Sequence, residues 1–216
     1  MKYELVIFDL DGTLLDTVED LRAALNYGLA QAGFPTKTRD EMKLIIGGGV
    51  RNHVKNAVPA GTSETVIDSV FNVFKARYAA HNNDTTRPFS GIPTLLKALK
   101  EASLRVAVNS NKLDEDSQRL IKAHFEGLVD MAIGDRAGVP RKPAPDSAFE
   151  IMAAMGVSPE RVLYVGDGDS DLLTAQHAGT DCAWVSWGYR KRDELGGLPI
   201  PHAFDTAEAL RDFILA

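Results

Sequence analysis

The feature that most constrains the fold is a short apolar segment near the start of the chain that ends abruptly in two acidic residues. Residues 5–8, Leu-Val-Ile-Phe, are rich in β-branched side chains and have no helical period, which predicts a buried strand. Such a strand is typical of a parallel sheet covered by helices on both faces. Asp9 and Asp11 follow it, and Gly12 allows a sharp turn. Because side chains two residues apart on an extended chain point the same way, both carboxylates are expected to face one site at the end of the sheet.

Two such carboxylates are suited to phosphoryl chemistry. One can attack phosphorus and form an aspartyl-phosphate. Its neighbour can protonate the leaving oxygen and then deprotonate the attacking water. The alternative is structural, since acidic residues also cap helices at strand-to-helix turns. The rest of the chain decides between the two interpretations.

Size and composition set limits on the fold and on the partners. The chain has 216 residues, enough for one domain with a sizeable insertion or for two modest domains. Its net charge of −6 argues against a general nucleic-acid or anionic-membrane partner. No apolar stretch approaches the length of a membrane span, and because a strand is expected almost from the first residues, no signal peptide is expected. Cys182 is the only cysteine and lies in an apolar, strand-like segment, so it is expected in the core, and a cytoplasmic location is expected.

The block from residue 16 to about residue 85 contains helical patterns and no convincing strand. A helix is expected from Asp16, which has capping-box spacing to Glu19, and another from Thr38, which has the same spacing to Glu41. Further helices are expected over residues 50–58 and 63–80, and residues 82–88 form a plausible hinge. A long helical block between two strands indicates an inserted cap. The predicted division is therefore a core of residues 1–15 and 88–216 and a helical cap of residues 16–87.

After residue 88 strands and helices alternate. Strands are expected at residues 104–108, 131–133, 162–165 and 182–185, and helices at 93–102, 114–123, 145–155 and 172–178. Asp205 with Glu208 is expected to cap a final helix. This alternation predicts an α/β fold, a doubly wound, Rossmann-like parallel sheet with right-handed crossovers.

Polar clusters follow three of the predicted strands, and a lysine lies on a loop before a helix. These residues are Asp9 and Asp11, Ser110 and Asn111, Asp167 and Asp171, and Lys142. Parallel strands bring their carboxyl ends to one edge of the sheet. Carboxylates about 4 Å apart would repel by roughly 4 kcal/mol per pair, so cations are needed. Lys142 is one candidate and a hard divalent ion the other, for which all-oxygen ligation suits Mg²⁺.

The four clusters and their order resemble the motifs of the haloacid dehalogenase superfamily of phosphatases over nearly the full chain. The motifs are Asp9-x-Asp11-Gly12-Thr13, Ser110 after a strand, Lys142-Pro143, and Gly166-Asp167-x-x-x-Asp171. The helical block looks like that superfamily's type 1 cap. Within the superfamily the chain is most similar to the phosphoglycolate phosphatase group, through residues 9–17, 88–91 and 186–189.

The resemblance implies a role for each motif residue. Asp9 would be the nucleophile and Asp11 the general acid and base, with Ser110, Asn111 and Lys142 holding the transferring phosphoryl group. Mg²⁺ would bind the Asp9 carboxylate, the Asp11 backbone carbonyl and Asp167, while Asp171 would orient a metal-bound water or Lys142. Gly168 stands where the family often has serine, and the position is expected to supply only backbone.

The glycine run at residues 47–49 has two open interpretations. It is either an ordinary link between helices or a cap loop that closes over the site, in which case Gly48 and Arg51 would contact the substrate. All five histidines are expected to be structural, as are Trp187 and Tyr189, and the basic run at residues 190–192 is expected to be a solvated loop.

The expected function is Mg²⁺-dependent hydrolysis of a small phosphorylated metabolite by a monomer or homodimer. A sugar-phosphate mutase of the same fold is the main alternative, although such sequences usually carry Val or a similar residue in place of Thr13. A phosphonate hydrolase would need a cap lysine, and Lys55 does not sit in a matching motif; a dehalogenase should lack Asp11. A receiver-like signalling domain or a non-catalytic binding protein belongs to another class, against which the helical insertion and Asp11 argue.

Overall fold

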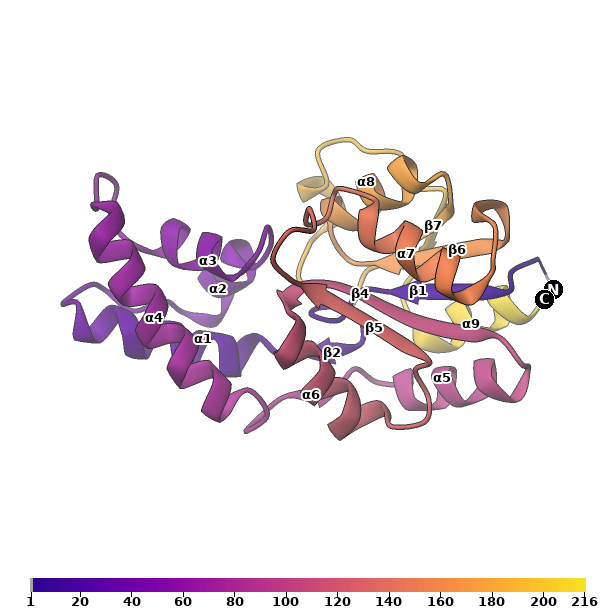
Figure 1. The fold of residues 1–216 in the computed structure, drawn as a ribbon, viewed down its shortest axis with the longest axis horizontal. Coiled ribbons are helices and arrows are strands. Elements are labelled where there is room, and N and C mark those ends of the chain that lie inside the picture. The colour runs from indigo at the N-terminus through magenta and orange to yellow at the C-terminus, as the bar shows by residue number, and fades with distance from the viewer. Residues whose placement is uncertain (1) are drawn as a thin grey trace.

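The computed structural model describes residues 2–216, and its centre is a six-stranded sheet in the order β5-β4-β1-β6-β7-β8 (Figure 1). Every neighbouring pair in this sheet is parallel. The strands are β1 (Leu5–Phe8), β4 (Arg105–Leu113), β5 (Met131–Asp135), β6 (Val162–Gly166), β7 (Asp181–Val185) and β8 (His202–Phe204). The predicted doubly wound α/β fold is confirmed. The edge strand β8 was not predicted, because three residues carry too little alternation to be recognised.

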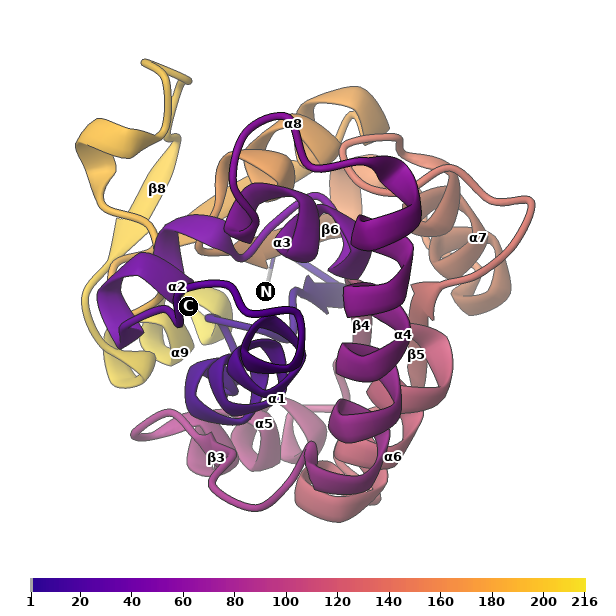
Figure 2. The same cartoon turned by 90° about the vertical axis from the view of Figure 1, so that its left-hand side faces the viewer.

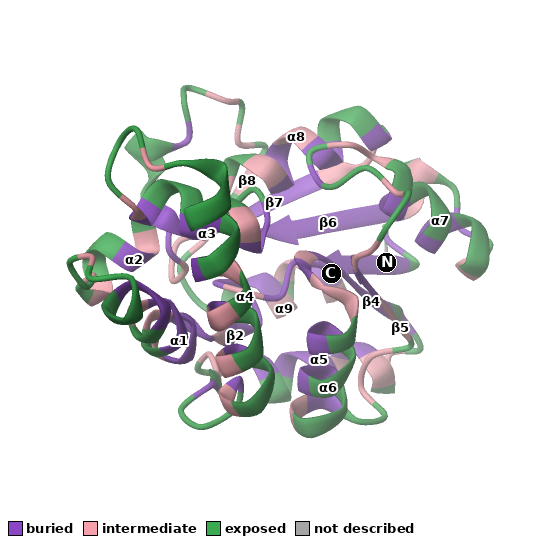
Figure 3. Ribbon diagram, turned by 60° about the vertical axis from the view of Figure 1, so that its left-hand side comes forward, coloured by how far each residue is buried: buried purple, intermediate pink, exposed green. Residues whose placement is uncertain are grey.

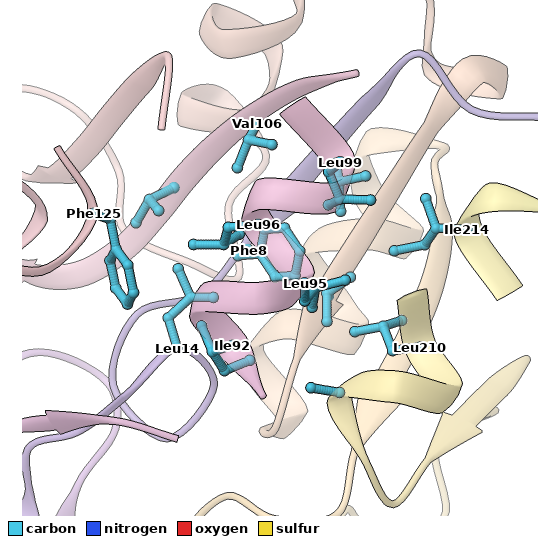
Figure 4. Close-up of a cluster of buried hydrophobic side chains, with 14 of the residues drawn as sticks. Phe8, Leu14, Ile92, Leu95, Leu96, Leu99, Val106, Phe125, Leu210 and Ile214 are labelled. Carbon is cyan, nitrogen blue, oxygen red and sulfur yellow. The ribbon is translucent and has the colours of Figure 1, made fainter. Parts of the chain in front are cut away.

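Strand β1 lies in the middle of the sheet and is fully buried. Its residues alternate between two hydrophobic clusters, with Val6 and Phe8 facing one and Leu5 and Ile7 the other. Helices α5 (Ile92–Glu101), α6 (Asp114–Phe125) and α9 (Ala207–Leu215) cover the Phe8 face, which Figure 4 shows in close-up. Helices α7 (Asp146–Met155) and α8 (Asp169–Ala178) cover the other. Burial on both faces explains why the β1 segment is continuously apolar.

The remaining helices form a layer beyond the carboxyl end of the sheet, and we call α1–α4 the helical layer (Figures 1 and 2). They are α1 (Val18–Gln31), α2 (Arg39–Ile45), α3 (Val50–Ala57) and α4 (Glu64–His81). They share a third hydrophobic cluster, which accounts for the buried stripes on their inner faces (Figure 3). Along the described chain, no helix is both long and apolar enough to cross a membrane.

Two short strands carry the chain into and out of the helical layer. These are β2 (Leu15–Asp16) and β3 (Arg87–Pro88), which pair antiparallel. Close by, the Asp20 carboxylate accepts hydrogen bonds from the backbone amides of Thr85 and Thr86 at 2.9–3.1 Å. The two connections are therefore held side by side.

Two of the predicted helix caps are wrong. Thr17 rather than Asp16 occupies the N-cap position of helix α1, where it makes no side-chain capping hydrogen bond, and the Asp16 carboxylate pairs with Arg39 at 2.7 Å. The last helix is capped by Thr206, whose hydroxyl accepts from Ala209. Asp205 instead accepts a hydrogen bond from Ser186. The capping box predicted for the second helix is confirmed.

Candidate active site

Three acidic side chains meet at the carboxyl end of the sheet, where β1 lies between β4 and β6. Phe8 is in register with Val165, and the Asp9 amide donates to the carbonyl of Val165 at 2.9 Å. Asp167 follows β6, and Asp171 lies in the first turn of α8. Carboxylate oxygens of Asp9, Asp167 and Asp171 lie within 4.8 Å of one another. The structure thus brings together residues more than 150 positions apart in the sequence, as the motifs predict.

Lys142 lies between two of these acids. Its buried Nζ is 2.7 Å from Oδ1 of Asp9 and 2.7 Å from Oδ1 of Asp171. Burial alone would lower the pKa of Lys142, but the Asp171 and Asp9 carboxylates raise it well above its usual value. Lys142 is therefore a permanent cation that fixes the orientation of Asp9.

The single positive charge of Lys142 does not neutralise the three carboxylates of this cluster. Burial raises the pKa of Asp9 to about 8, with Asp171 and Asp167 adding to the rise and Lys142 opposing it. Burial, followed by the charge of Asp171, raises the pKa of Asp167 to about 7. Buried carboxylates resist ionisation when too few cations are near. An all-oxygen donor set of this kind fits a hard divalent metal ion.

The backbone around Asp167 is shaped to receive its carboxylate. A Cβ on Gly12 would lie 2.5 Å from Oδ2 of Asp167, and one on Gly188 would lie 2.3 Å from its Cβ. The Tyr189 amide donates to Oδ2 of Asp167 at 2.6 Å, and Trp184 donates from its indole to the Asp167 carbonyl at 2.9 Å. Glycine is therefore required at both positions to hold Asp167 against the other acids.

Asp11 lies beside this cluster but has different partners. Its Oδ1 accepts a hydrogen bond from the Thr17 hydroxyl at 2.6 Å, and its Oδ2 is 2.9 Å from Nζ of Lys112. Lys112 is buried, and its ammonium also donates to the hydroxyl of Tyr78 on α4 at 2.8 Å. Asp11 thus contacts Lys112 on β4 and Thr17, the residue directly before α1.

Lys112 is a residue of the site that the sequence motifs do not include. The strand was expected to end at residue 108, whereas β4 continues to Leu113. Because Ser110 and Lys112 are two residues apart on this extended segment, their side chains share a face. The alternation of Ser110 and Lys112 could have indicated that the strand continues. Polar residues after an apolar strand, however, are usually interpreted as a loop.

Ser110 and Asn111 lie where the second motif predicts. Ser110 is buried, and its hydroxyl accepts from the Lys112 amide at 3.2 Å. The Asn111 side chain donates to the carbonyl of Lys142 at 3.1 Å, which ties two motifs together. Both residues line a small cavity with Asp9 and Asp11.

This cavity, of about 50 Å³, separates the acids from the helical layer. It is lined by Asp9, Asp11, Ile46, Gly47, Gly49, Val50, His53, Ser110, Asn111, Lys112, Lys142 and Ser170. Gly47 and Gly49 reach it, but Gly48 and Arg51 are not among its lining residues. The Arg51 guanidinium instead pairs with Glu64 at 2.7 Å and Asp68 at 2.6 Å. A substrate contact by Gly48 or Arg51 stays a prediction that needs a rearranged helical layer.

The segment after β7 connects the site to the helical layer. Trp187 donates to the carbonyl of Thr13 at 3.0 Å, and the buried Tyr189 hydroxyl accepts from the Thr17 amide at 2.8 Å, so both pack as predicted. The prediction of a solvated basic loop is wrong for Arg190. Its guanidinium donates to the carbonyls of Lys43 and Ile46, at the end of α2. A basic run does not by itself reveal such a long-range partner.

Together the fold and the site define a class: an α/β enzyme with a buried, lysine-held aspartate, a second acid two residues later and a cluster of three acids that could hold a metal ion. Residues 6–185 match the family model of haloacid dehalogenase-like hydrolases. The chain belongs to this family and is a phosphatase within it, which confirms the resemblance drawn from the motifs.

Individual relatives agree with this assignment. The chain is 34% identical over 187 residues to the phosphoglycolate phosphatase of Aquifex aeolicus (strain VF5), with 86% of each chain covered. It is 30% identical to the N-acetylmuramic acid 6-phosphate phosphatase of Pseudomonas aeruginosa, covering 88% of this chain and 84% of that one. A solved structure of a candidate phosphoglycolate phosphatase from Lactobacillus delbrueckii subsp. bulgaricus superimposes with a TM-score of 0.94 at 36% identity, over 99% of both chains.

Proposed function

We propose that this chain hydrolyses a small phosphomonoester through an aspartyl-phosphate on Asp9, with Asp11 as the general acid and base. The observation that carries the proposal is the pair of acids at the end of β1, of which Asp9 is held by Lys142 and Asp11 is not. The two acids therefore have separate environments, as separate roles require.

The reaction then has two steps. In the first, an oxygen of Asp9 bonds to phosphorus, the bond from phosphorus to the leaving oxygen breaks, and Asp11 gives that oxygen a proton. In the second, Asp11 takes a proton from a water that attacks phosphorus, and the bond to Asp9 breaks to release phosphate. Ser110 and Asn111 would contact the phosphoryl oxygens, and the Lys142 ammonium would offset their negative charge.

Mg²⁺ is the metal we propose for the acidic site. Asp9, Asp167 and the backbone carbonyl of Asp11 would hold it, and Asp171 would orient Lys142, from which it lies 2.7 Å away. When bound, the ion supplies positive charge to the phosphoryl oxygens and lowers the repulsion between the nucleophile and the phosphate.

Residues 16–87 would act as a cap that excludes water during the first step and opens for exchange of product. This division is supported by the separate hydrophobic cluster of the helical layer and by its two adjacent connections at β2 and β3. The enzyme is proposed to act in the cytoplasm as a monomer or homodimer.

Phosphoglycolate is the substrate that we propose, on the basis of the relatives named above. The test is release of phosphate, with and without Mg²⁺, from phosphoglycolate, hexose phosphates, pyrophosphate, nucleoside monophosphates and a phosphonate, with the Asp9→Asn variant as the blank. A clear preference for phosphoglycolate supports the full proposal. Broad, weak hydrolysis of esters supports the mechanism and contradicts the substrate, and no release from any ester contradicts both.

A further inference from the structure

His53 has no role in the mechanism above, yet it lies at the site. It projects from α3 of the helical layer, is buried, and lines the same cavity as Asp9, Asp11 and Lys112. The sequence predicts a structural role for it, since a lone histidine in a helix belongs to no motif.

The hydrogen bonds of His53 fix its tautomer. The backbone amide of Gly47 donates to Nε2 of the imidazole at 3.1 Å. Nε2 must therefore keep its lone pair, and the proton of the neutral ring is on Nδ1. Burial, followed by the charge of Lys112, lowers the pKa of His53 to about 4, so the ring is neutral at physiological pH.

The Nδ1–H group of this ring is a buried donor without an acceptor among the described residues. Leaving such a group unpaired destabilises the folded protein, because the donor loses its hydrogen bond to water and gains none in return. Because buried polar groups are rarely left unpaired, an unpaired donor on a residue that lines the cavity points to a partner supplied by a ligand.

We propose that Nδ1–H of His53 donates a hydrogen bond to a carboxylate oxygen on the leaving group of the substrate. The inference rests on the function proposed above and adds a residue that determines specificity. Because the tautomer is fixed, the Nδ1–H group can only donate a hydrogen bond. It therefore favours a substrate group that accepts a hydrogen bond over one that donates. The Lys112 ammonium, which lines the same cavity, favours an acceptor that is negatively charged, and the small volume of the cavity favours a short acid.

Two substitutions separate the functions of the two ring nitrogens. In glutamine the terminal amide atoms are as many bonds from the backbone as Nε2, so His53→Gln keeps an acceptor for the Gly47 amide and removes the Nδ1 donor. In asparagine the amide nitrogen is as many bonds from the backbone as Nδ1, so His53→Asn keeps the donor and removes the acceptor for Gly47. Each variant is the matched control of the other.

The test measures kcat and KM on phosphoglycolate and on 2-methylpropyl phosphate, in which two methyl groups replace the carboxylate oxygens. Wild-type enzyme should prefer phosphoglycolate. In His53→Gln, kcat/KM for phosphoglycolate should fall roughly 10- to 100-fold, mainly through KM, because a hydrogen bond to a charged group is lost. The value for 2-methylpropyl phosphate should fall much less than the value for phosphoglycolate. His53→Asn should keep the preference while its free energy of unfolding falls.

The outcomes distinguish this inference from the function on which it rests. If wild-type enzyme hydrolyses both esters equally well, or if His53→Gln keeps the wild-type preference, the role of His53 is overturned and the phosphatase mechanism stands. An equal loss on both esters in His53→Gln also overturns it, because it shows general damage to the site. If wild-type enzyme hydrolyses neither these esters nor any other phosphomonoester, the proposed function itself fails.

Discussion

The ammonium of Lys112 lies 2.9 Å from Oδ2 of Asp11, although Lys112 is on β4, Asp11 follows β1, and the sequence motifs include only Asp11. The other Asp11 oxygen accepts from Thr17, at the start of α1, and Lys112 in turn contacts Tyr78 on α4. Both oxygens of the proposed acid and base are therefore occupied. Each carboxylate oxygen can accept a further hydrogen bond, so proton transfer does not require these contacts to break, but they make the orientation of Asp11 sensitive to the position of the helical layer.

Replacing Lys112 by methionine should destabilise the protein through Asp11. The change leaves a largely buried carboxylate without its cation, and breaking a buried ion pair costs about 3–5 kcal/mol. The measurement is urea unfolding of Lys112→Met, Asp11→Asn and the double variant. The double variant should be more stable than the sum of the single losses predicts, because it removes both charges.

Lys55→Met is the control for this cycle, since Lys55 is exposed and lies 3.9 Å from Glu64. Its effect should stay within about 0.5 kcal/mol. Strictly additive losses in the cycle would show that Lys112 and Asp11 are energetically independent.

The two acids at the end of β1 should fail in different ways. Asp9→Asn removes the nucleophile, so neither turnover nor a phosphorylated protein is expected. Asp11→Asn should slow turnover by about 10²–10⁴-fold and let phosphorylated protein accumulate, because water is no longer deprotonated. Intact-protein mass spectrometry after mixing with phosphoglycolate and Mg²⁺ measures the phosphorylated fraction. The control is Asp146→Asn, at the exposed start of a helix, which should behave like wild-type enzyme. Normal turnover by Asp9→Asn or by Asp11→Asn would contradict the mechanism.

The parts of the site that sequence could predict are those whose geometry depends on strand ends. Asp9, Asp167 and Lys142 could be grouped because parallel strands end at one edge, and this follows from alternation of strands and helices alone. Lys112 was missed because β4 extends through an irregular pairing past Asn109, where polar residues read as a loop. His53 and Arg190 could not be assigned, because their partners, Gly47 and the end of α2, are set by the packing of the helical layer on the sheet.

Arg190 should restrain the loop that carries the glycine run. Its guanidinium donates to the carbonyls of Lys43 and Ile46, and one of its nitrogens would lie 3.3 Å from a Cβ placed on Gly47. Arg190→Met removes these charge-assisted bonds, worth about 1.5–3 kcal/mol each. Amide hydrogen exchange over residues 44–50 should therefore rise, and KM should increase by roughly 10-fold or more, the factor to which the energy of one such bond corresponds.

The control for Arg190 is Arg192→Met, two residues further along the same segment and exposed to solvent. It removes the same charge from the same segment. It therefore tests whether the change in hydrogen exchange comes from the lost charge or from the lost hydrogen bonds of Arg190 to Lys43 and Ile46. Equal exchange in both variants and wild-type enzyme would show that the helical layer holds this loop without Arg190.

The neutral state of His53 should be visible in the pH dependence of stability. Its pKa is lowered from 6.5 to about 4 in the folded protein, so between these values the unfolded chain binds the proton more readily. The stabilising contribution is complete above pH 6.5 and is lost as the pH falls towards 4, which amounts to about 2–3 kcal/mol. Both His53→Gln and His53→Asn lack a titrating ring, so the free energy of unfolding from urea titrations should fall less steeply for them between pH 6.5 and 4. Curves parallel to that of wild type would show that the ring takes up a proton as readily in the folded protein as in the unfolded chain. The ring would then have no fixed neutral tautomer, and the proposed recognition of a carboxylate by His53 would be wrong.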